Sequence, residues 1–393
     1  MTDVVIASGV RTPIGKFGGV LKDVPAAELG RIAAEEALRR AGITPHEVDE
    51  LIVGHARQAG NGPNLARQIG YSAGVPVDRP AYTVNKACAS GLKAITLAYQ
   101  AIVAGEHAVI LAAGVEQMSQ IPYLLTKARW GYRLGGDDLV DAMHRDGYYC
   151  PLAEMMMGGT AEILVNEYGI GREEQDQFAL QSHQKAVRAW EKGLFDAEVV
   201  PVDVPGRKGQ TKRVAVDERP RPDTTIEKLA RLQPVFKEDG TITAGNASGI
   251  TDAAAAVVVM RADRAAALGI EPLARIKGFA SAGVDPKRMG MGPVPATEKV
   301  LAQTGLSLDD LDLIELNEAF AAQVLAVERE LDWDVDRRNV HGGAIALGHP
   351  TGCTGTRIVV TLLHAMQQRD AEIGLATLCV SGGLGMTLLV NRV

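Results

Sequence analysis

Apolar and polar residues alternate in short blocks along the first third of the chain, and these blocks predict strands and helices in turn. Two blocks, 26–41 and 90–104, carry apolar residues at helical spacing, and each is followed by a glycine where a helix would end. The short apolar runs that predict buried strands are 4–8, 51–54, 81–84 and 108–113. Strands that alternate with helices predict a mostly parallel α/β sheet.

The middle of the chain, from about Glu116 to Ser248, has a different pattern. It is more polar and richer in Arg, Asp and Gly than the regions on either side. Stretches 159–168 and 173–192 predict helices, and 199–216 predicts a hairpin with Pro and Gly near its turn. We interpret this region as an inserted domain or a large excursion from the sheet.

The last third returns to the alternation of the first. The predicted strands are 312–316, 374–380 and 386–390, and the predicted helices are 319–331 and 355–368. Two α/β regions of similar rhythm suggest an internal duplication, although the agreement between their residues does not prove one.

Composition and charge narrow the class of protein. The chain has 393 residues, of which 46% are apolar and 23% are charged. This profile is typical of a soluble globular protein of roughly two to three domains, and it excludes wholesale disorder. The net charge of −7 disfavours non-specific binding to nucleic acid or to an anionic membrane. No uninterrupted apolar run approaches the roughly 18 residues that a membrane-spanning helix needs.

The first residues and the cysteines bear on the compartment. The chain passes directly from Met1, Thr2 and Asp3 into an apolar run, without the pattern of a signal or transit peptide. Its four cysteines are widely spaced, which is typical of free thiols in a reducing compartment. The sequence therefore predicts a cytoplasmic protein.

Cys88 is a candidate nucleophile. It lies between a predicted strand and the helix predicted over 90–104, among small residues that permit a sharp turn. At a helix N-terminus a thiolate is stabilised by unpaired N–H groups and by the helix dipole. The alternative is a buried structural cysteine, the commonest fate of a free thiol.

Two further candidates lie in the last third, each in glycine-rich sequence. His349 stands within 342–352, just before a predicted helix, where it is suited to act as a base or a hydrogen-bond donor. Its alternative is a turn histidine bonded to a carbonyl. Cys379 ends the strand predicted over 374–380, and the glycines after it offer N–H groups to an oxyanion. Taken alone, that segment favours an ordinary strand-end cysteine beside a hairpin.

Asn317 and a basic run are weaker candidates. Asn317 follows the strand predicted over 312–316, at the edge where open α/β sheets bind ligands, and it would serve equally well as a helix cap. The basic run forms either a solvated surface or a site for the phosphates of a nucleotide-bearing substrate. Its members are Arg207, Lys208, Lys212, Arg213, Arg219 and Arg221.

The remaining cysteines predict no metal site. Cys353 lies four residues after His349, but two ligands do not make a zinc site, and no further Cys/His pair has ligand spacing. Cys150 lies in polar loop sequence and is assigned no role.

Taken together, these segments resemble the thiolase family, the acetyl-CoA acetyltransferases and 3-ketoacyl-CoA thiolases. The resemblance runs from end to end of the chain and follows the order of the family's motifs. The segments that carry it are Val10–Gly15, Asn85–Ala94, Thr243–Gly249, Asn317–Phe320, Gly342–Gly352 and Thr377–Gly385.

The resemblance implies a five-layered αβαβα sandwich of two duplicated α/β halves with an inserted loop domain. Residues 1–117 with about 249–270 would form the N-terminal half, and 271–393 the C-terminal half. Residues 118–248 would form the inserted domain, which binds CoA. The resemblance also implies a homo-oligomer, either a dimer or a tetramer. From the charge and the apolar runs described above, we expect no nucleic-acid or membrane partner.

The implied activity is reversible acyl transfer between an enzyme cysteine and CoA. It would join two acetyl-CoA into acetoacetyl-CoA, or cleave 3-ketoacyl-CoA by thiolysis, as in fatty acid metabolism. Acyl-CoA and CoA are the substrates, and no cofactor is needed beyond them.

The resemblance also assigns roles to residues. Cys88 matches the nucleophile that becomes acylated, and His349 the histidine that activates it and helps to form an oxyanion hole. Cys379 matches the acid/base that acts on the acetyl methyl group, and Asn317 the residue that orients a water in the oxyanion hole. The matches to the CoA pocket are Met157, Arg221, Ser248 and Phe320.

Two departures from the family pattern leave the acyl chain length and the physiological direction open. Ser381 stands where many members have Gly, and Met156 stands where biosynthetic members often have His.

Three other functions remain as alternatives. A decarboxylating condensing enzyme of the same superfamily would pair one Cys with two His, or with His and Asn, and Cys379 speaks against it. A cysteine hydrolase would release free acid. A non-catalytic acyl-CoA-binding protein would be expected to lose at least one of Cys88, His349 and Cys379, and this chain retains all three.

Overall fold

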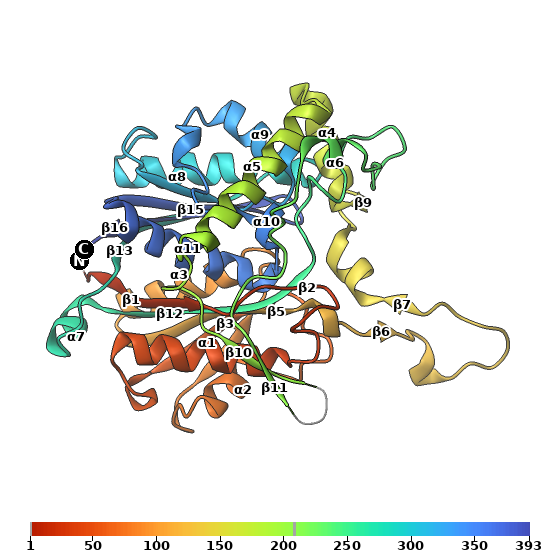
Figure 1. The fold of residues 1–393 in the computed structure, drawn as a ribbon. Helices are drawn as coiled ribbons and strands as arrows, with labels where there is room; N and C mark the ends of the chain where they lie inside the picture. The colour runs from red at the N-terminus through yellow and green to blue at the C-terminus, as the bar shows by residue number, and fades with distance from the viewer. Residues whose placement is uncertain (1, 207–209) are drawn as a thin grey trace.

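A computed structural model describes residues 2–206 and 210–393 as five layers, with two stacked sheets and helices between and outside them (Figure 1). The lower sheet in Figure 1 contains β1 (Val4–Arg11), β3 (Glu50–Gly54), β4 (Ala81–Val84), β5 (Val109–Gln117) and β12 (Thr251–Arg261). The upper sheet contains β13 (Ala274–Gly283), β14 (Leu313–Leu316), β15 (Ile373–Val380) and β16 (Leu384–Arg392). The layering implied by the family resemblance is therefore confirmed.

Helices cover both sheets from outside and fill the space between them. The outer helices are α1 (Ala26–Ala41) and α2 (Leu65–Ser72) below, with α8 (Pro293–Thr304) and α9 (Ala321–Glu330) above. The middle layer consists of α3 (Ser90–Ala104) and α11 (Thr351–Arg369). Because the middle helices meet a sheet on either side, α11 is buried along almost its whole length. The segment Ala87–Ala104 is long enough and apolar enough to cross a membrane. Most of it, however, forms α3, which lies between the two sheets.

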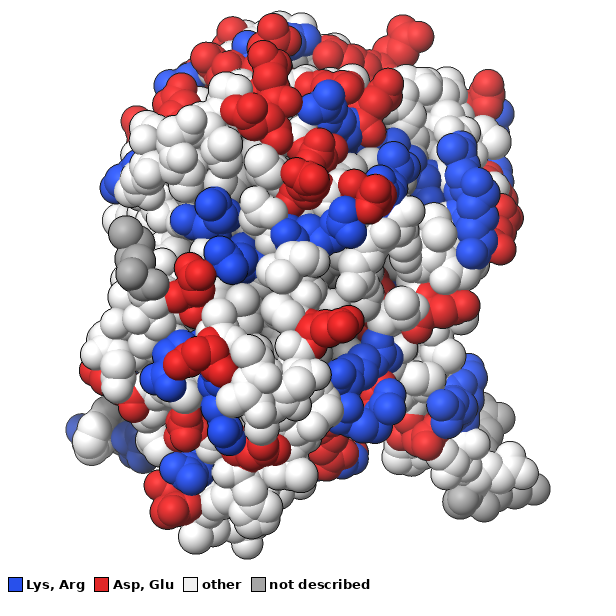
Figure 2. Space-filling view, turned by 90° about the vertical axis from the view of Figure 1, so that its left-hand side faces the viewer, with Lys and Arg blue, Asp and Glu red and all other residues white. Residues whose placement is uncertain are grey.

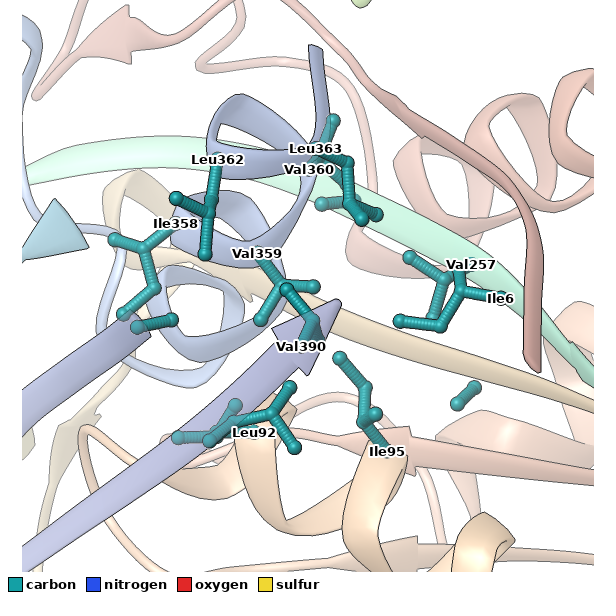
Figure 3. Close-up of a cluster of buried hydrophobic side chains, with 14 of the residues drawn as sticks. Ile6, Leu92, Ile95, Val257, Ile358, Val359, Val360, Leu362, Leu363 and Val390 are labelled. Carbon is teal, nitrogen blue, oxygen red and sulfur yellow. The ribbon is translucent and has the colours of Figure 1, made fainter. Parts of the chain in front are cut away.

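The largest hydrophobic cluster lies in this middle layer (Figure 3). Leu92 and Ile95 of α3 and Val359 of α11 pack between the two sheets, with Val257 from the lower sheet and Val390 from the upper one. Burial of such side chains stabilises the fold by roughly 1.5–3 kcal/mol each. The middle helices, whose first turns adjoin the candidate site, are thus rigidly placed.

The prediction of a mostly parallel sheet is wrong. Among the named strands of the described residues, only β3–β4, β3–β5 and β14–β15 pair in parallel in these sheets. The pairs β1–β12, β12–β5, β1–β13, β13–β16 and β15–β16 are antiparallel. β15 and β16 are joined by a short glycine turn, which permits only antiparallel pairing. The other antiparallel pairs involve β12 and β13, two long strands that the sequence pattern did not predict.

The two sheets are continuous through a single short contact. β1 pairs with β13 through Val5–Arg275 and Ile6–Ala274 alone, so each half keeps its own sheet. The halves also meet through the side chains of the middle layer and through backbone hydrogen bonds such as that from the His349 N–H to the Gly249 carbonyl at 2.9 Å.

Several predicted elements are confirmed at or near their expected bounds. The helices predicted over 26–41 and 90–104 are α1 and α3, and both end at a left-handed glycine, Gly42 and Gly105. The helix predicted over 355–368 is α11, which begins four residues earlier, at Thr351. This earlier start places His349 directly before the first helical turn.

The excursion in the middle of the chain leaves the end of β5 and returns at the start of β12, where Gln117 pairs with Asp252. It contains the helices α4 (Met157–Tyr168), α5 (Arg172–Glu191) and α6 (Ile226–Ala230). It also contains the short strand pairs β6–β7 (Tyr123–Leu124 and Val140–Asp141), β8–β9 (Tyr149–Cys150 and Met155–Met156) and β10–β11 (Val202–Pro205 and Thr211–Val214). The predicted domain boundaries, 1–117 with about 249–270, 118–248 and 271–393, stay a prediction.

Two features of the surface complete the fold. Residues 123–141 form an arm that projects from the body, at the right of Figure 1. On the face that carries both termini, turned toward the viewer in Figure 2, basic and acidic side chains are interspersed.

Candidate active site

Cys88 lies on a sharp turn between β4 and α3. Ala87 adopts a φ of 46°, a left-handed conformation that few residues other than glycine tolerate. Polar side chains hold this turn: Asn85 Oδ1 accepts from the Ala87 N–H at 2.9 Å, and Ser90 Oγ donates to the Ala87 carbonyl at 2.6 Å. The predicted turn is therefore present, and it directs Cys88 into a cavity.

His349 is held by its neighbours so that one ring nitrogen is free. Its Nδ1 lies 2.7 Å from Oγ1 of Thr354, and that hydroxyl donates to the carbonyl of Pro350 at 3.0 Å. Because the hydroxyl proton is used for Pro350, Nδ1 of His349 carries the ring proton and Nε2 is an acceptor. The ring thus bonds a hydroxyl, unlike the turn histidine bonded to a carbonyl that was the alternative.

Burial, with the positive charges of Arg357 and Arg57, lowers the pKa of His349 to about 3. The imidazole is therefore neutral at physiological pH and is able to take a proton at Nε2.

Cys379 lies at the end of β15, where its residue is only 2% exposed. Burial raises the pKa of its thiol, and the nearby Cys88 raises it further. After Ser381 the chain turns through Gly382 and Gly383, both with positive φ, and continues into β16.

Cys88, His349 and Cys379 line one cavity of about 430 Å³. Met157, Ser248, Phe320 and Tyr148 line it too, and the same four line a larger outer cavity of about 1130 Å³. The structure therefore brings the three chemical groups together from separate segments and places three of the predicted CoA-pocket residues between them and the outer cavity.

The fourth predicted CoA-pocket residue lies farther out. Arg221 lines a separate cavity of about 890 Å³, together with His183, Lys228 and Arg219. Arg219 also lines the large outer cavity, so the two cavities adjoin. Burial and the charges of Arg219 and Arg221 lower the pKa of His183 to about 4, so the positive charge here comes from the arginines and Lys228.

The predicted basic run is not a single surface. Arg207 and Lys208 lie outside the described residues. Lys212 and Arg213 are exposed on β11, and only Arg219 and Arg221 reach the cavities described above. Of the two departures from the family pattern, Met156 lines the outer cavity and Ser381 the inner one.

Asn317 is fully buried directly after β14 and does not cap α9, because Phe320 occupies the N-cap position. Within the described residues, neither polar atom of its side-chain amide has a hydrogen-bond partner. The helix-cap alternative is therefore wrong. Asn317 is not among the residues that line the inner or the outer cavity, so the structure does not bring it to the cavity lining with Cys88, His349 and Cys379.

A buried network that the sequence reasoning missed surrounds these groups. Glu116 of β5 accepts hydrogen bonds from the Thr351 hydroxyl at 2.7 Å and from the Arg57 N–H at 3.1 Å, and it pairs with Nδ1 of His55 at 3.0 Å. Burial alone would raise the pKa of Glu116, but these partners bring it down to about 2. The carboxylate thereby ties the loop after β3 to the first turn of α11.

Arg57, Tyr148, Met289 and Thr351 also line the inner cavity and were likewise missed. One signal could have identified Arg57, namely its position just after β3. That strand pairs with β4 and therefore ends beside Cys88. Tyr148 and Met289 lie in irregular segments with no comparable signal.

The other two cysteines lie apart from this chemistry. Cys353 is buried in α11, and burial raises the pKa of its thiol. Cys150 is buried on β8. Within residues 2–206 and 210–393, no group of three His, Cys, Asp or Glu side chains gathers at metal-binding distance.

The arrangement is suited to covalent acyl transfer. A thiol on a sharp turn, a neutral imidazole acceptor and a second thiol face one small cavity. A nucleophile and a separate acid/base in one cavity permit a reaction in two steps, with a covalent intermediate between them.

Comparison with known proteins agrees with this chemistry. The family models "Thiolase, N-terminal domain" and "Thiolase, C-terminal domain" match residues 4–263 and 270–392. The chain is 52% identical over 392 residues to a probable acetyl-CoA acyltransferase of Staphylococcus aureus, with 100% of both chains covered.

Two solved structures have the same fold. One is the Bacillus anthracis acetyl-CoA acetyltransferase, with a TM-score of 0.98, 48% identity, and 100% of this chain and 99% of that chain covered. The other is the human mitochondrial 3-ketoacyl-CoA thiolase in complex with CoA, with a TM-score of 0.96, 43% identity, and 100% and 98% covered.

Proposed function

The chain belongs to the thiolase family, and from this premise we propose that Cys88, His349, Cys379 and Asn317 carry out the reaction of the family. The protein is an acyltransferase that moves acyl groups reversibly between an enzyme cysteine and CoA. It condenses two acetyl-CoA to acetoacetyl-CoA, cleaves 3-ketoacyl-CoA by thiolysis, or does both, and it needs no cofactor beyond CoA thioesters.

One observation carries the assignment of residues. Cys88, His349 and Cys379 come from three segments that are far apart in the sequence, and their side chains line a single cavity of about 430 Å³. A structural role for each residue alone gives no reason for this convergence.

The first step is acylation of Cys88. Nε2 of His349 takes the thiol proton, and the thiolate attacks the thioester carbonyl of acetyl-CoA. The C–S bond to CoA breaks, the CoA thiolate takes the proton, and Cys88 keeps the acetyl group. The side-chain amide of Asn317 acts here through a water that stabilises the oxyanion.

The second step is formation of the carbon–carbon bond. Cys379, as a thiolate, removes a proton from the methyl group of a second acetyl-CoA, and the carbanion attacks the acetyl carbonyl on Cys88. The bond from the acetyl group to Cys88 breaks, acetoacetyl-CoA leaves, and the Cys88 thiolate takes the proton that Cys379 removed from the methyl group, so Cys379 is again a thiolate. Thiolysis is the reverse sequence.

Product analysis tests this function. The protein, mixed with acetoacetyl-CoA and free CoA, should form two acetyl-CoA for each acetoacetyl-CoA consumed. Release of free acid would identify a hydrolase, and release of CO₂ from malonyl-CoA a decarboxylating condensing enzyme. Binding without turnover would leave only an acyl-CoA-binding protein.

We also propose that CoA occupies the outer cavities, with Met157, Ser248 and Phe320 beside its pantetheine arm and Arg221 near its phosphates. Arg221→Glu should raise the KM for CoA and leave kcat nearly unchanged, and added salt should raise the wild-type KM. Arg213→Glu, an exposed arginine of the same basic run, is the matched control. Equal effects of the two variants would indicate that the basic run is only a solvated surface and does not bind the phosphates of CoA.

The finer assignments are proposals of the same kind. We propose a homo-oligomer, a tetramer, because the arm over 123–141 exposes apolar side chains, with Trp130 87% exposed. Trp130→Ser should then lower the mass measured by light scattering. We propose that the protein acts in the cytoplasm, a reducing compartment, because all four cysteines are free. We also propose a role in fatty acid metabolism, because the substrates are CoA thioesters.

A further inference from the structure

Arg57 is a buried cation that lines the inner cavity. It follows β3, and its residue is only 9% exposed. Its Nη2 donates to the carbonyl of Gly147 at 2.8 Å, and its backbone N–H donates to Glu116. Gly147 allows this approach, since a Cβ there would lie 3.0 Å from Nε of Arg57.

The guanidinium of Arg57 has no direct counter-ion. Within the described residues, no carboxylate oxygen lies within 4.0 Å of it, and its buried Nε has no hydrogen-bond partner. Glu116, the nearby carboxylate, is already occupied by His55, Thr351 and backbone N–H groups. An arginine that is buried without a carboxylate is costly, so the charge calls for an anion in the cavity that it lines.

The side chain of Cys88 lines the same cavity and becomes an anion in the reaction. Burial raises the pKa of its thiol, and the charge of Arg57 is the largest influence that lowers it, ahead of the N–H of Ser381. The other charged or titratable groups that face this thiol are Glu116, His349, Cys379 and Tyr148.

None of those other groups supplies a positive charge. Glu116 is a carboxylate, His349 is neutral because burial lowers its pKa to about 3, and burial raises the pKa of both Cys379 and Tyr148. Arg57 is therefore the one formal cation among the described groups at this thiol.

We propose that Arg57 is a positioning residue for the nucleophile, and that its guanidinium stabilises the Cys88 thiolate before acylation and again when the acyl group leaves. This role rests on the proposed function of Cys88. Arg57 neither gives nor takes a proton, since the proton of Cys88 passes to His349 in either case. Its charge also disfavours the imidazolium and so favours transfer of that proton onward to the leaving CoA thiolate.

The test measures the ionisation of Cys88 without any substrate. The intact wild-type protein and Arg57→Leu are alkylated with iodoacetamide from pH 6 to 10, and modification of the Cys88 peptide is followed by mass spectrometry. Because only the thiolate reacts, Arg57→Leu should be alkylated about tenfold more slowly at pH 7, which corresponds to one pKa unit. The gap should narrow as the pH rises through 9.

Two further variants separate charge from structure. Arg57→Lys keeps the charge and should keep the pH profile close to wild type. Arg145→Leu removes an exposed arginine from the adjacent turn and should change nothing. The proposal would be overturned if the alkylation rate of Cys88 in Arg57→Leu equals that of wild type at every pH, or if it is lower by the same factor at every pH.

The proposed function has its own readout. Failure of wild-type protein to acetylate Cys88 from acetyl-CoA would remove that function while leaving the alkylation profiles interpretable. Acetylation of Cys88 together with unchanged profiles would remove only the role of Arg57.

Discussion

Cys88 and Cys379 face the same cavity, yet their surroundings differ, and Cys88 is partly exposed whereas Cys379 is buried. Cys88 lies on a strained turn at the start of α3, and its thiolate has the charge of Arg57 and the N–H of Ser381 nearby. Cys379 lies at the end of a strand, where burial raises the pKa of its thiol first of all and Cys88 raises it further.

The difference indicates an order of events. While Cys88 carries a negative charge, Cys379 resists ionisation, because two like charges in one buried cavity repel each other. In the proposed mechanism, acylation of Cys88 removes that charge, and with it the one of the two influences raising the pKa of Cys379 that is not burial. The second step is thus favoured only after the first, without any movement of the backbone.

The largest loss of activity is expected when the proposed nucleophile, Cys88, is removed. Cys88→Ala should lower acyl transfer by on the order of 10⁴-fold or more, because the covalent route is lost. Folding should be nearly unchanged, and circular dichroism checks this. Cys150→Ala is the control and should retain activity and a label on Cys88. An acetyl label on any residue other than Cys88 in wild-type protein would contradict the assignment.

Removal of the second thiol should separate the two steps. Cys379→Ala should still acquire acetyl on Cys88, but condensation should fall roughly 10²–10⁴-fold, the usual contribution of general acid–base catalysis. Exchange of the methyl deuterium of acetyl-CoA with water is the decisive measurement. If the variant exchanges at the wild-type rate, Cys379 is not the base and His349 takes its place.

The lowered pKa of His349 predicts how the free energy of unfolding changes with pH. The folded-state pKa of His349, about 3, lies below its ordinary value of 6.5, so between these values only the unfolded chain binds the proton, and stability falls as pH falls. From pH 6.5 to 5, wild type should lose about 1.6 kcal/mol more than His349→Gln, because the loss approaches 1.36 kcal/mol per pH unit only as the unfolded chain becomes fully protonated. Urea unfolding at each pH measures this. Parallel curves would mean that the folded protein protonates His349.

The smallest effect concerns the residue that touches Cys88 through its backbone. Ser381→Gly keeps the N–H that faces the sulfur, so activity should stay within roughly tenfold, about 1.4 kcal/mol in barrier. A steady-state assay of thiolysis is sufficient. Complete loss would show that the serine hydroxyl has a role of its own.

Elements defined by local signals were predictable from the sequence. α1 and α3 were placed correctly because apolar spacing sets each helix and a left-handed glycine ends it, Gly42 in one and Gly105 in the other. Cys88 and His349 could be singled out as candidates, since a sharp turn of small residues and a glycine-rich segment are both local features, and the structure places both at one cavity.

What depends on distant partners was not predictable. β12 begins with an alanine-rich run that resembles a helix, and only its place between β1 and β5 makes it a strand. The direction of strand pairing failed for the same reason. Arg57 and Glu116 gain their importance from contacts with Gly147 and Thr351, which the sequence places far away.

The long excursion between β5 and β12 also delays the pairing of these two strands during synthesis of the chain. Residues 118–250 must be made before β12 can cover the edge of β5, a delay on the order of ten seconds at usual translation rates. The nascent chain carries Cys88 throughout this time, while His349 and Cys379 belong to its final stretch. A product released early therefore holds Cys88 without His349 and Cys379, and under the proposed mechanism such an incomplete chain should not turn over acyl-CoA.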